Sequence, residues 1–476
     1  MKQGRKYFFL FLAMLCQAVT ATAQTDSSFQ LKIPTDTITD KITIGNIDIT
    51  GNKKTKDVII LREIPFKTGD QFPMKVLLEK FADGKKQLLN TRLFNAVIVA
   101  ADHFEGQVVH VKIIVRERWY FFPVPYFSFV DRNLNQWLVE HHASLKRVNY
   151  GAKLYYNNTT GRNDNLKLKV TNGYTKQLSL SYDRLYFDKK MKWGGKFFMD
   201  AGKNKEVNYA TENNKQAFYK DENVFTRKFL KTYLEVSYRR AIKARHSFGI
   251  GFTQETVADT VTRLNPDYFS NGKNRLSFPE LRYTMDYYDV NYIPYPTKGY
   301  IVQLNFFKKG VNKNMNSWEW QAKGSAYWPV APKTFLTLTL IGQLKLPFHQ
   351  PYYNKRVLGY GDSYLQGYEY YVVDGVAGGI AKSTLSRELA NFSINLFGKN
   401  GKKGIRIPFR IFGKIYGNTG YVHNPQPNNN SLTNKMLYSG GFGIDILTLY
   451  DVTFKLEYSF NAIGENGLFL HQNSFF

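Results

Sequence analysis

After its first two dozen residues, the chain has no apolar run long enough to cross a membrane as a helix. This absence excludes an ordinary helical membrane protein. Cysteine is almost missing as well, since Cys16 is the only one in 476 residues and no disulfide can form within the chain. Without that covalent support, we expect strand ladders and side-chain packing to hold the fold together.

Sequence motifs for catalysis and cofactor binding are also missing. No G-x-S-x-G occurs, and Gly378–Ser383 departs from the P-loop pattern because Ala381 stands where glycine must precede the lysine. Glu140 and His142 would share one face of a strand, while His141 would point away and no third metal ligand accompanies them. We therefore predict a protein that is not an enzyme and needs no cofactor.

The N-terminus has the features of a secretion signal. Basic residues precede an apolar core from Tyr7 to Ala18, and Ala21-Thr22-Ala23 forms a small-residue cleavage site. We predict a signal peptide over 1–23 and a polar linker over 24–40. The net charge of +27 would suggest a nucleic-acid partner in a cytoplasmic protein, but export removes that partner. Two interpretations of the charge stay open: contact with an anionic membrane leaflet, or a solvated lumen and loop surface.

What the chain does contain is repeated alternation of apolar and polar residues with a period of two. Between Val452 and Phe460, for example, every even position is apolar or aromatic and every odd position is polar. Successive strand side chains point to opposite faces, so such a segment has one apolar and one polar face. Aromatic residues make up 16% of the chain, as expected for interface girdles. From residue 119 onward we predict a mostly β fold, a transmembrane antiparallel β-barrel of about 16 strands, at roughly 22 residues for each strand and its connection.

A different pattern precedes the barrel, over residues 41–118. Ile42, Ile44, Ile47 and Ile49 indicate a strand that ends at a Gly-Asn turn, and Lys56 to Glu63 has the pattern of a short helix. Pro73 suits the first turn of a helix that reaches about Asn90. Two strands follow, near Asn95 to Ala101 and Gln107 to Arg116. The order β-α-α-β-β predicts one small α+β domain.

Three strings in this domain resemble the POTRA domain: Ile47 to Ile64, Arg92 to Val99, and Val111 to Arg118. The last string is similar to the closing strand that leads directly into a barrel. The resemblance implies a periplasmic domain that binds extended client polypeptides by adding a strand to an open sheet edge.

The barrel region resembles the outer-membrane surface-antigen family that contains BamA and TamA. Tyr283 to Tyr300 is similar to the family's PTKG segment, and Arg356 to Glu369 to its large sixth extracellular loop. Other segments match the family's later strands in order: TLSREL from Thr384 to Leu389 as a strand start, GGFGIDI from Gly440 to Ile446, DVTFKLEYSF from Asp451 to Phe460, and GLFLHQNSFF from Gly467 to the C-terminal aromatic Phe476.

The resemblance also implies two sets of site residues. The predicted turn motif consists of Pro296, Thr297, Lys298 and Gly299. The predicted lumen-loop motif consists of Leu365, Gln366, Gly367, Tyr368 and Glu369. The family carries arginine where this chain has Gln366, and that arginine pairs with acidic and aromatic groups on the inner wall. Either the contact is weaker here, or Arg356 or Arg387 replaces the arginine; Asp445 and Glu369 are candidates for the acidic side.

The predicted first strand, Trp119 to Phe129, contains Pro123 and Pro125. Proline donates no backbone hydrogen bond, and two prolines of one parity remove donors from the same side of a strand. That side is either the closing seam of the barrel or the second strand, unless the strand starts only after Pro125.

Together these features predict an outer-membrane protein with its N-terminal domain in the periplasm. The resemblance implies a factor for assembly, insertion or translocation that works through a weak barrel seam. The alternatives are a dedicated exporter or passive channel, or a structural anchor. The implied partners are outer-membrane lipid and lipopolysaccharide, extended client polypeptides, and periplasmic or lipoprotein accessory subunits.

Overall fold

The computed structural model of the chain describes residues 41–129, 142, 144, 147–221, 223–239, 242–361, 363–396 and 405–473. The predicted signal peptide and linker, the pair Glu140-His141 and the C-terminal Phe476 lie outside these residues. No helix in the described part of the chain is long and apolar enough to cross a membrane.

The N-terminal domain is a sheet in the order β2-β1-β4-β3 with two helices. Leu77, Phe81 and Leu88 lie on one face of the longer helix and are buried against the sheet, because their spacing matches the helical period. A short strand, β2, which the sequence pattern does not predict, precedes the longer helix and pairs with the first strand. The elements are β1 (Lys41–Thr50), α2 (Asp57–Glu63), β2 (Gln71–Pro73), α3 (Met74–Asn90), β3 (Phe94–Glu105) and β4 (Val108–Glu117).

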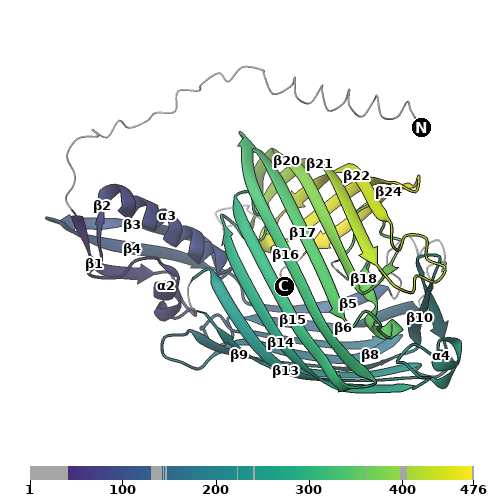
Figure 1. The fold of residues 1–476 in the computed structure, drawn as a ribbon. Helices are drawn as coiled ribbons and strands as arrows, with labels where there is room; N and C mark the ends of the chain where they lie inside the picture. Colours follow the sequence, from purple (N-terminus) through teal and green to yellow (C-terminus); the bar gives the residue numbers. More distant parts are fainter. Residues whose placement is uncertain are drawn as a thin grey trace, which may run out of the picture.

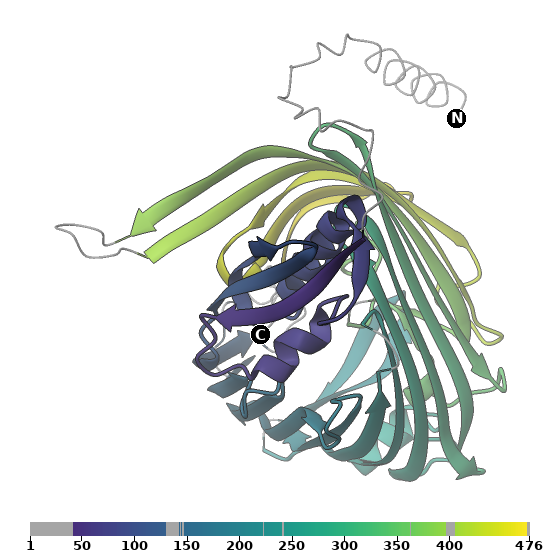
Figure 2. The same ribbon diagram turned by 90° about the vertical axis from the view of Figure 1, so that its left-hand side faces the viewer.

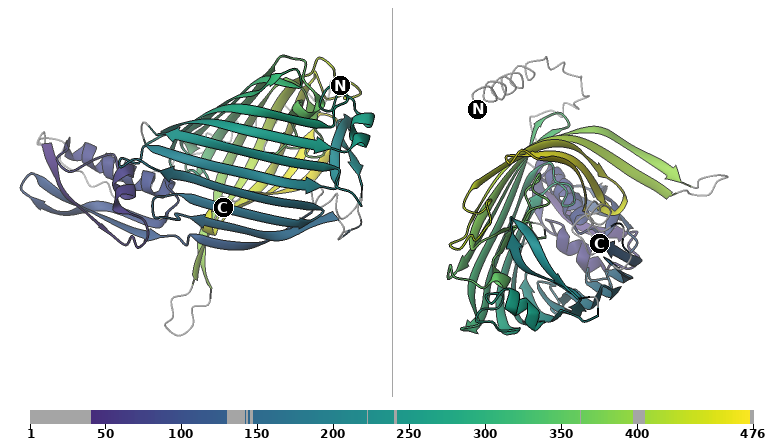
Figure 3. Two further views of the ribbon diagram at one scale, coloured as in Figure 1. Left: turned by 90° about the horizontal axis from the view of Figure 1, so that it is seen from below. Right: turned by 90° about the vertical axis from the view of Figure 1, so that its right-hand side faces the viewer.

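Within the described residues, sixteen strands form one antiparallel sheet that curls into a barrel (Figures 1 and 3). The predicted fold class is therefore confirmed. The strands are β5 (Phe121–Phe129), β6 (Val148–Asn157), β7 (Asn165–Gly173), β8 (Thr175–Tyr186), β9 (Trp193–Asn204), β12 (Arg227–Tyr238), β13 (Ala244–Val257), β14 (Arg275–Val290), β15 (Gly299–Asn312), β16 (Met315–Ala331), β17 (Thr334–Leu346), β20 (Ala377–Leu396), β21 (Ile405–His423), β22 (Met436–Leu447), β23 (Thr453–Asn461) and β24 (Asn466–Asn473).

The predicted alternation separates the two faces of the barrel wall. On β23, Phe454 and Leu456 are 38% and 44% exposed on the outer face, whereas Glu457 and Ser459 are 1% and 0% exposed on the inner face. The outer face is thus apolar and the lumen polar, as a membrane-spanning barrel requires.

Connections at the end away from the N-terminal domain, the distal end, carry extra elements. The connection between β9 and β12 contains β10 (Glu206–Glu212), which pairs with β11 (Lys215–Lys220); α4 (Asp259–Leu264) packs beside them. The long connection between β17 and β20 contains β18 (Arg356–Leu358) and β19 (Val373–Asp374). Because β20 begins at Ala377, the segment 384–389 lies within that strand rather than at its start.

The N-terminal domain lies across the opposite, proximal end of the barrel (Figure 2). Glu63 of α2 accepts hydrogen bonds of 2.5 and 2.6 Å from Arg239, which follows β12. Lys86 of α3 lies 3.2 Å from Asp289 on β14. These charged contacts, made by different strands, fix the domain against the rim of the lumen.

Candidate functional site

The loop between β17 and β20 turns back into the lumen, and its tip, residues 365–369, packs against the inner wall. Leu365 and Tyr368 are 0% and 1% exposed. Gln366 donates a 2.7 Å hydrogen bond from Nε2 to Oε1 of Glu457 on β23, and its own Oε1 accepts one of 3.3 Å from Asn418 on β21. The tip is therefore held through a neutral amide that binds a carboxylate.

The backbone of the tip is held as well. Asn461 donates a 2.7 Å hydrogen bond to the carbonyl of Gly367, whose own N–H binds Glu369 at 2.8 Å. Gly367 has a φ of +89°, and a Cβ there would lie 3.2 Å from the carbonyl oxygen of Phe460. Any other residue would be strained in this conformation, so the glycine allows the close approach of tip and wall.

Beneath the tip, one buried lysine pairs with two carboxylates. Nζ of Lys414 on β21 lies 2.5 Å from Oδ1 of Asp445 on β22 and 2.5 Å from Oε1 of Glu457 on β23. All three side chains are at most 6% exposed. His471 on β24 brings a ring nitrogen within 3.4 Å of Glu457. Three neighbouring wall strands are thus tied by side chains in addition to their backbone ladders, and β24 contributes its histidine to the same group.

The same network reaches the turn motif at the proximal end. Asp445 accepts a 3.0 Å hydrogen bond from the hydroxyl of Tyr295, which directly precedes Pro296. The turn itself is organised by Asn291, whose side chain binds the backbone N–H groups of Thr297 and Lys298. A chain of contacts therefore joins the loop tip, through the wall strands, to the connection between β14 and β15.

Gly299 closes this turn, and its φ is +105°. A Cβ at that position would lie 1.9 Å from the carbonyl oxygen of Asp289, so only glycine fits. The turn also contacts the N-terminal domain, because the N–H of Ile293 donates a 3.0 Å hydrogen bond to Asn90 of α3.

The remaining candidates for the loop contact lie elsewhere. Arg356 packs over the ring of Tyr360 in the base of the loop, 5.5 Å from its centroid. Arg387 is exposed on β20, on the face opposite the lumen. Neither arginine meets Gln366 in the described structure; the ammonium that pairs with Glu457 beside the tip is that of Lys414, which comes from the wall.

Pro123 and Pro125 both lie within β5, opposite Leu154 and Ala152 of β6. In an antiparallel ladder, opposed residues alternate between pairs that exchange two hydrogen bonds and pairs that exchange none. The N–H of Asn157 donates to the carbonyl of Tyr120, which assigns the bonded pairs to the even-numbered residues of β5. The proline nitrogens consequently face away from β6, toward the outer edge of the sheet.

That edge is one of two free edges, because β5 and β24 are the ends of the sheet and no ladder joins them among the described residues. At the turn between β23 and β24, the N–H of Asn461 donates to the carbonyl of Glu465, so the hydrogen-bonded pairs involve the odd-numbered residues of β24. The backbone N–H and C=O groups of Leu468 and Leu470 therefore point away from β23, toward the free edge. On β5, the indole N–H of Trp119 binds the edge-facing carbonyl of Phe121. The two edges thus differ: β24 presents donors and acceptors, whereas β5 lacks two donors.

A cavity of about 530 Å³ lies between the N-terminal domain and the proximal part of the lumen. Its lining is rich in cations, so part of the chain's positive charge faces the lumen rather than the loops. The charged residues of the lining that the structure describes are Glu63, Arg92, Lys167, Asp183, Arg184, Lys196, Glu235, Arg239, Lys243, Arg245, Arg282 and Asp286.

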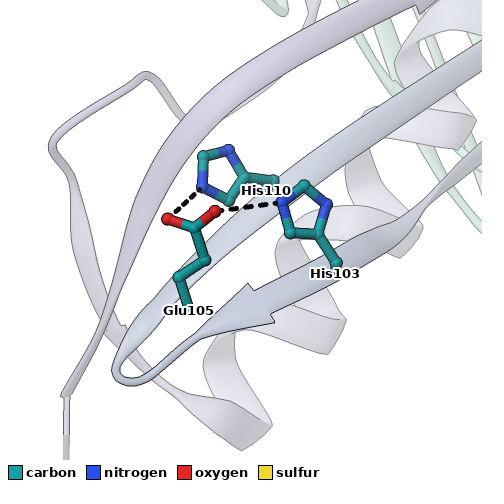
Figure 4. A group of neighbouring side chains, drawn as sticks. All are labelled: His103, Glu105 and His110. Atoms are coloured by element: carbon teal, nitrogen blue, oxygen red, sulfur yellow. Dashed lines mark ion pairs between the residues drawn. The ribbon is translucent and has the colours of Figure 1, made fainter.

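One group of potential metal ligands occurs in the described residues, at the hairpin end of the N-terminal domain (Figure 4). The Nε2 atoms of His103 and His110 lie 3.5 and 3.6 Å from the two carboxylate oxygens of Glu105. The rings are stacked with an interplanar angle of 6°, so their in-plane lone pairs run side by side instead of converging on one ion. Nδ1 of His110 also accepts a hydrogen bond from the N–H of Asn46, which places the proton of the neutral ring on Nε2. The arrangement fits a polar surface cluster rather than a metal site.

Two residues of the lumen network could not be selected from sequence. Glu457 and Lys414 look like ordinary polar positions of alternating strands, and only their place on the inner face hints at a role. Their partners lie 91 and 31 residues away along the chain. Such pairings depend on the barrel register, which a single sequence does not provide.

Two family profiles match the chain. The POTRA profile, described as surface antigen variable number repeat, matches residues 42–118, and the Omp85 superfamily domain matches residues 158–448. The outer membrane protein assembly factor BamA of Neorickettsia risticii (strain Illinois) is 35% identical over 81 residues, which are 17% of this chain and 10% of that protein. The chain therefore aligns with about a tenth of the length of this relative.

Among solved structures, BamA from Haemophilus ducreyi lacking POTRA domains 1–3 has a TM-score of 0.52 at 16% identity, covering 91% of this chain and 84% of that one. CdiB from Acinetobacter baumannii has a TM-score of 0.48 at 12% identity, covering 91% and 72%. The first likeness supports the fold described above.

Proposed function

The chain belongs to the Omp85 superfamily and carries one POTRA domain, and from this membership we propose that it inserts polypeptides into the outer membrane or moves them across it. The barrel is located in the outer membrane, with the N-terminal domain in the periplasm. The distal end then faces the cell exterior. The finer steps of the proposal concern the seam, the periplasmic domain and the lumen network.

The observation that carries the proposal is the pair of free edges at β5 and β24. Leu468 and Leu470 direct backbone groups toward the seam, so an extended client strand can pair with β24. Strand β5 competes poorly for that edge, because Pro123 and Pro125 offer no donors to it. Each ladder bond that cannot form forfeits about 0.5–1.5 kcal/mol net, and more in lipid, where no water replaces it. The seam is therefore the place where this barrel opens.

The periplasmic domain supplies a first contact for the client. Strand β3 is an edge of its sheet, with only β4 beside it in the described residues, and Ile98 and Phe104 on it are 53% and 49% exposed. An extended segment can add to such an edge through backbone hydrogen bonds, which favour no particular sequence. The docked domain holds this edge at the proximal end of the barrel.

The lumen network braces the wall beside the seam. Gln366, Lys414 and Glu457 connect the loop tip to β21, β22 and β23. Because these contacts hold β21, β22 and β23 together, the three strands keep their register when a client strand pairs with β24. The loop tip thus acts as an internal support for opening at one seam, and the neutral amide of Gln366 serves this purpose without the charge found elsewhere in the family.

A dedicated exporter of one substrate remains the alternative within the same family. The observation that favours it is the cation-rich cavity at the proximal end, which suits the passage of an acidic chain. A structural anchor remains a third option for a chain with one small domain.

Depletion of the protein, followed by quantitative proteomics of the outer membrane, tests the proposal. We expect the amounts of many different β-barrel proteins to fall together, and re-expression of the intact chain to restore them. Loss of a single exported protein, with other barrels unchanged, would favour the dedicated exporter. An unchanged outer membrane would contradict both functions.

A further inference from the structure

Strands β20 and β21 extend well beyond their neighbours at the periplasmic end. The ladder between β17 and β20 ends at Arg387, and the ladder between β21 and β22 begins at Arg410. Among the described residues, 389–396 pair only with β21 and 405–409 pair only with β20, and we refer to these two segments as the ribbon. Figure 2 shows the ribbon as light-green arms that leave the barrel wall sideways, away from the POTRA domain. A two-stranded element of this kind is marginally stable on its own in water.

One face of the ribbon is apolar. Phe392 lies opposite Phe409, and Ile394 lies opposite Ile407 in the register. The rings of the first pair stack with centroids 5.5 Å apart, and Phe392 and Ile394 are 44% and 45% exposed. These side chains have neighbours along the ribbon but nothing above them in the described structure.

The other face of the ribbon is polar. Asn391 lies opposite Arg410, and Ser393 lies opposite Pro408. Arg410 pairs with Glu388 at 2.5 Å, so the charge on this face is held close to the barrel wall. The ribbon is consequently amphipathic across its thickness, with one side suited to hydrocarbon and the other to water.

The apolar face continues the outer surface of the barrel. On β21, Phe412 and Lys414 point into the lumen, so the odd-numbered residues, from Phe409 to Ile415, share the outer side. Ile415 is 43% exposed there, within the membrane-spanning part of the wall. The lipid-facing surface therefore extends onto the ribbon, with the exposed Arg387 of β20, opposite Gly413, at the point where the ribbon leaves the wall.

From this geometry we propose that the ribbon lies in the periplasmic leaflet of the outer membrane, with Phe392, Ile394 and Phe409 in the acyl region and Asn391 and Ser393 in the headgroup layer. Continuity with the lipid-facing wall favours lipid over a protein partner. Proline on an edge strand discourages pairing with another chain, and Pro408 lies on the ribbon's second strand.

Spin labels test the placement. In a chain with Cys16→Ser, nitroxides are placed singly at Phe392, Ile394 and Ser393, with Ile415 as the lipid-facing control. The protein is reconstituted in vesicles of phosphatidylethanolamine and phosphatidylglycerol. The measured quantity is the ratio of the label's collision rate with oxygen to its collision rate with a water-soluble nickel chelate. We expect this ratio to be several-fold higher at positions 392, 394 and 415 than at position 393.

Equal access of the nickel chelate to positions 392, 394 and 393 would overturn the proposal. The proposal would also be overturned if a label at 392 were shielded from both reagents in native membranes but exposed to water in the vesicles. That result would mean that a protein covers the apolar face in the cell. A matched pair of variants completes the test, with the label at Phe409. Phe392→Asp with Ile394→Asp should abolish the oxygen preference at 409, whereas Ser393→Asp with Asn395→Asp should leave it unchanged. Heat-modifiable migration on gels verifies that each variant is folded.

Discussion

At the scale of single residues, Lys414 forms two buried ion pairs on the lumen side of the wall. It is 4% exposed and lies 2.5 Å from each of two buried carboxylates, those of Asp445 and Glu457. Lys414→Met would remove the ammonium that pairs with both acids, and breaking a buried ion pair from one side costs about 3–5 kcal/mol. We expect the temperature at which the barrel loses its folded migration on gels to fall markedly.

The matched control removes the charges together. Adding Asp445→Asn and Glu457→Gln to Lys414→Met replaces all three members of the ion-paired group by neutral side chains, so most of the lost stability should return. A single Lys414→Met variant as heat-resistant as the unsubstituted barrel would indicate that water screens these acids in the lumen.

Gln366 offers a second test at this scale. Gln366→Leu removes hydrogen bonds to Glu457 and Asn418, each worth about 0.5–1.5 kcal/mol, and should speed protease cleavage of the loop. Gln366→Arg keeps a donor for Glu457 and should be tolerated. Loss of function in the arginine variant alone would mean that the neutral amide is essential here.

At the scale of elements, we expect the loop tip to be shielded from reagents outside the cell. Cysteines at Gln366 and Tyr368 should react slowly with an extracellular thiol reagent, because both side chains are buried against the wall. Asn428, exposed on the distal connection between β21 and β22, is the matched control and should react rapidly. Equal rates at all three positions would place the tip outside the lumen.

The strands and helices of the fold were predictable from the sequence to different degrees. The wall strands were predictable, because alternation with period two directly reports one apolar and one polar face, as in β23. The helices of the POTRA domain were predictable for the same kind of reason. The short β2 was missed because its three residues are too few for a period. The lumen network was missed because Glu457 meets Gln366 only once the barrel register is set.

At the scale of the whole molecule, docking of the POTRA domain depends on Glu63. Burial raises the pKa of this carboxyl, but the charges and hydrogen bonds of Arg239 and Arg62 outweigh burial and lower the pKa from 4.5 to about 2. A lowered pKa means that the stabilisation is fully present above pH 4.5 and is lost as the pH falls through about 2. Wild-type docking should therefore persist at pH 5.

Glu63→Gln should loosen docking even at neutral pH, because Arg239 loses its counter-ion. Distances between spin labels on the POTRA domain and on the barrel rim would broaden in this variant and stay narrow in the intact protein. Lys86→Ala is the matched control: its contact with Asp289 is longer and more exposed, so a smaller effect is expected. Broad distances in the intact protein at pH 7 would contradict the docked arrangement.

Opening of the barrel between β5 and β24 can be tested by locking that seam with a disulfide. One cysteine within Phe121–Phe129 and one within Asn466–Asn473 form the lock. Tyr458→Cys with Leu468→Cys crosslinks a ladder that already exists and serves as the control. The oxidised seam lock should abolish outer-membrane assembly, reduction should restore it, and the control crosslink should have no effect. Full activity with the seam completely crosslinked would mean that the barrel works without opening there.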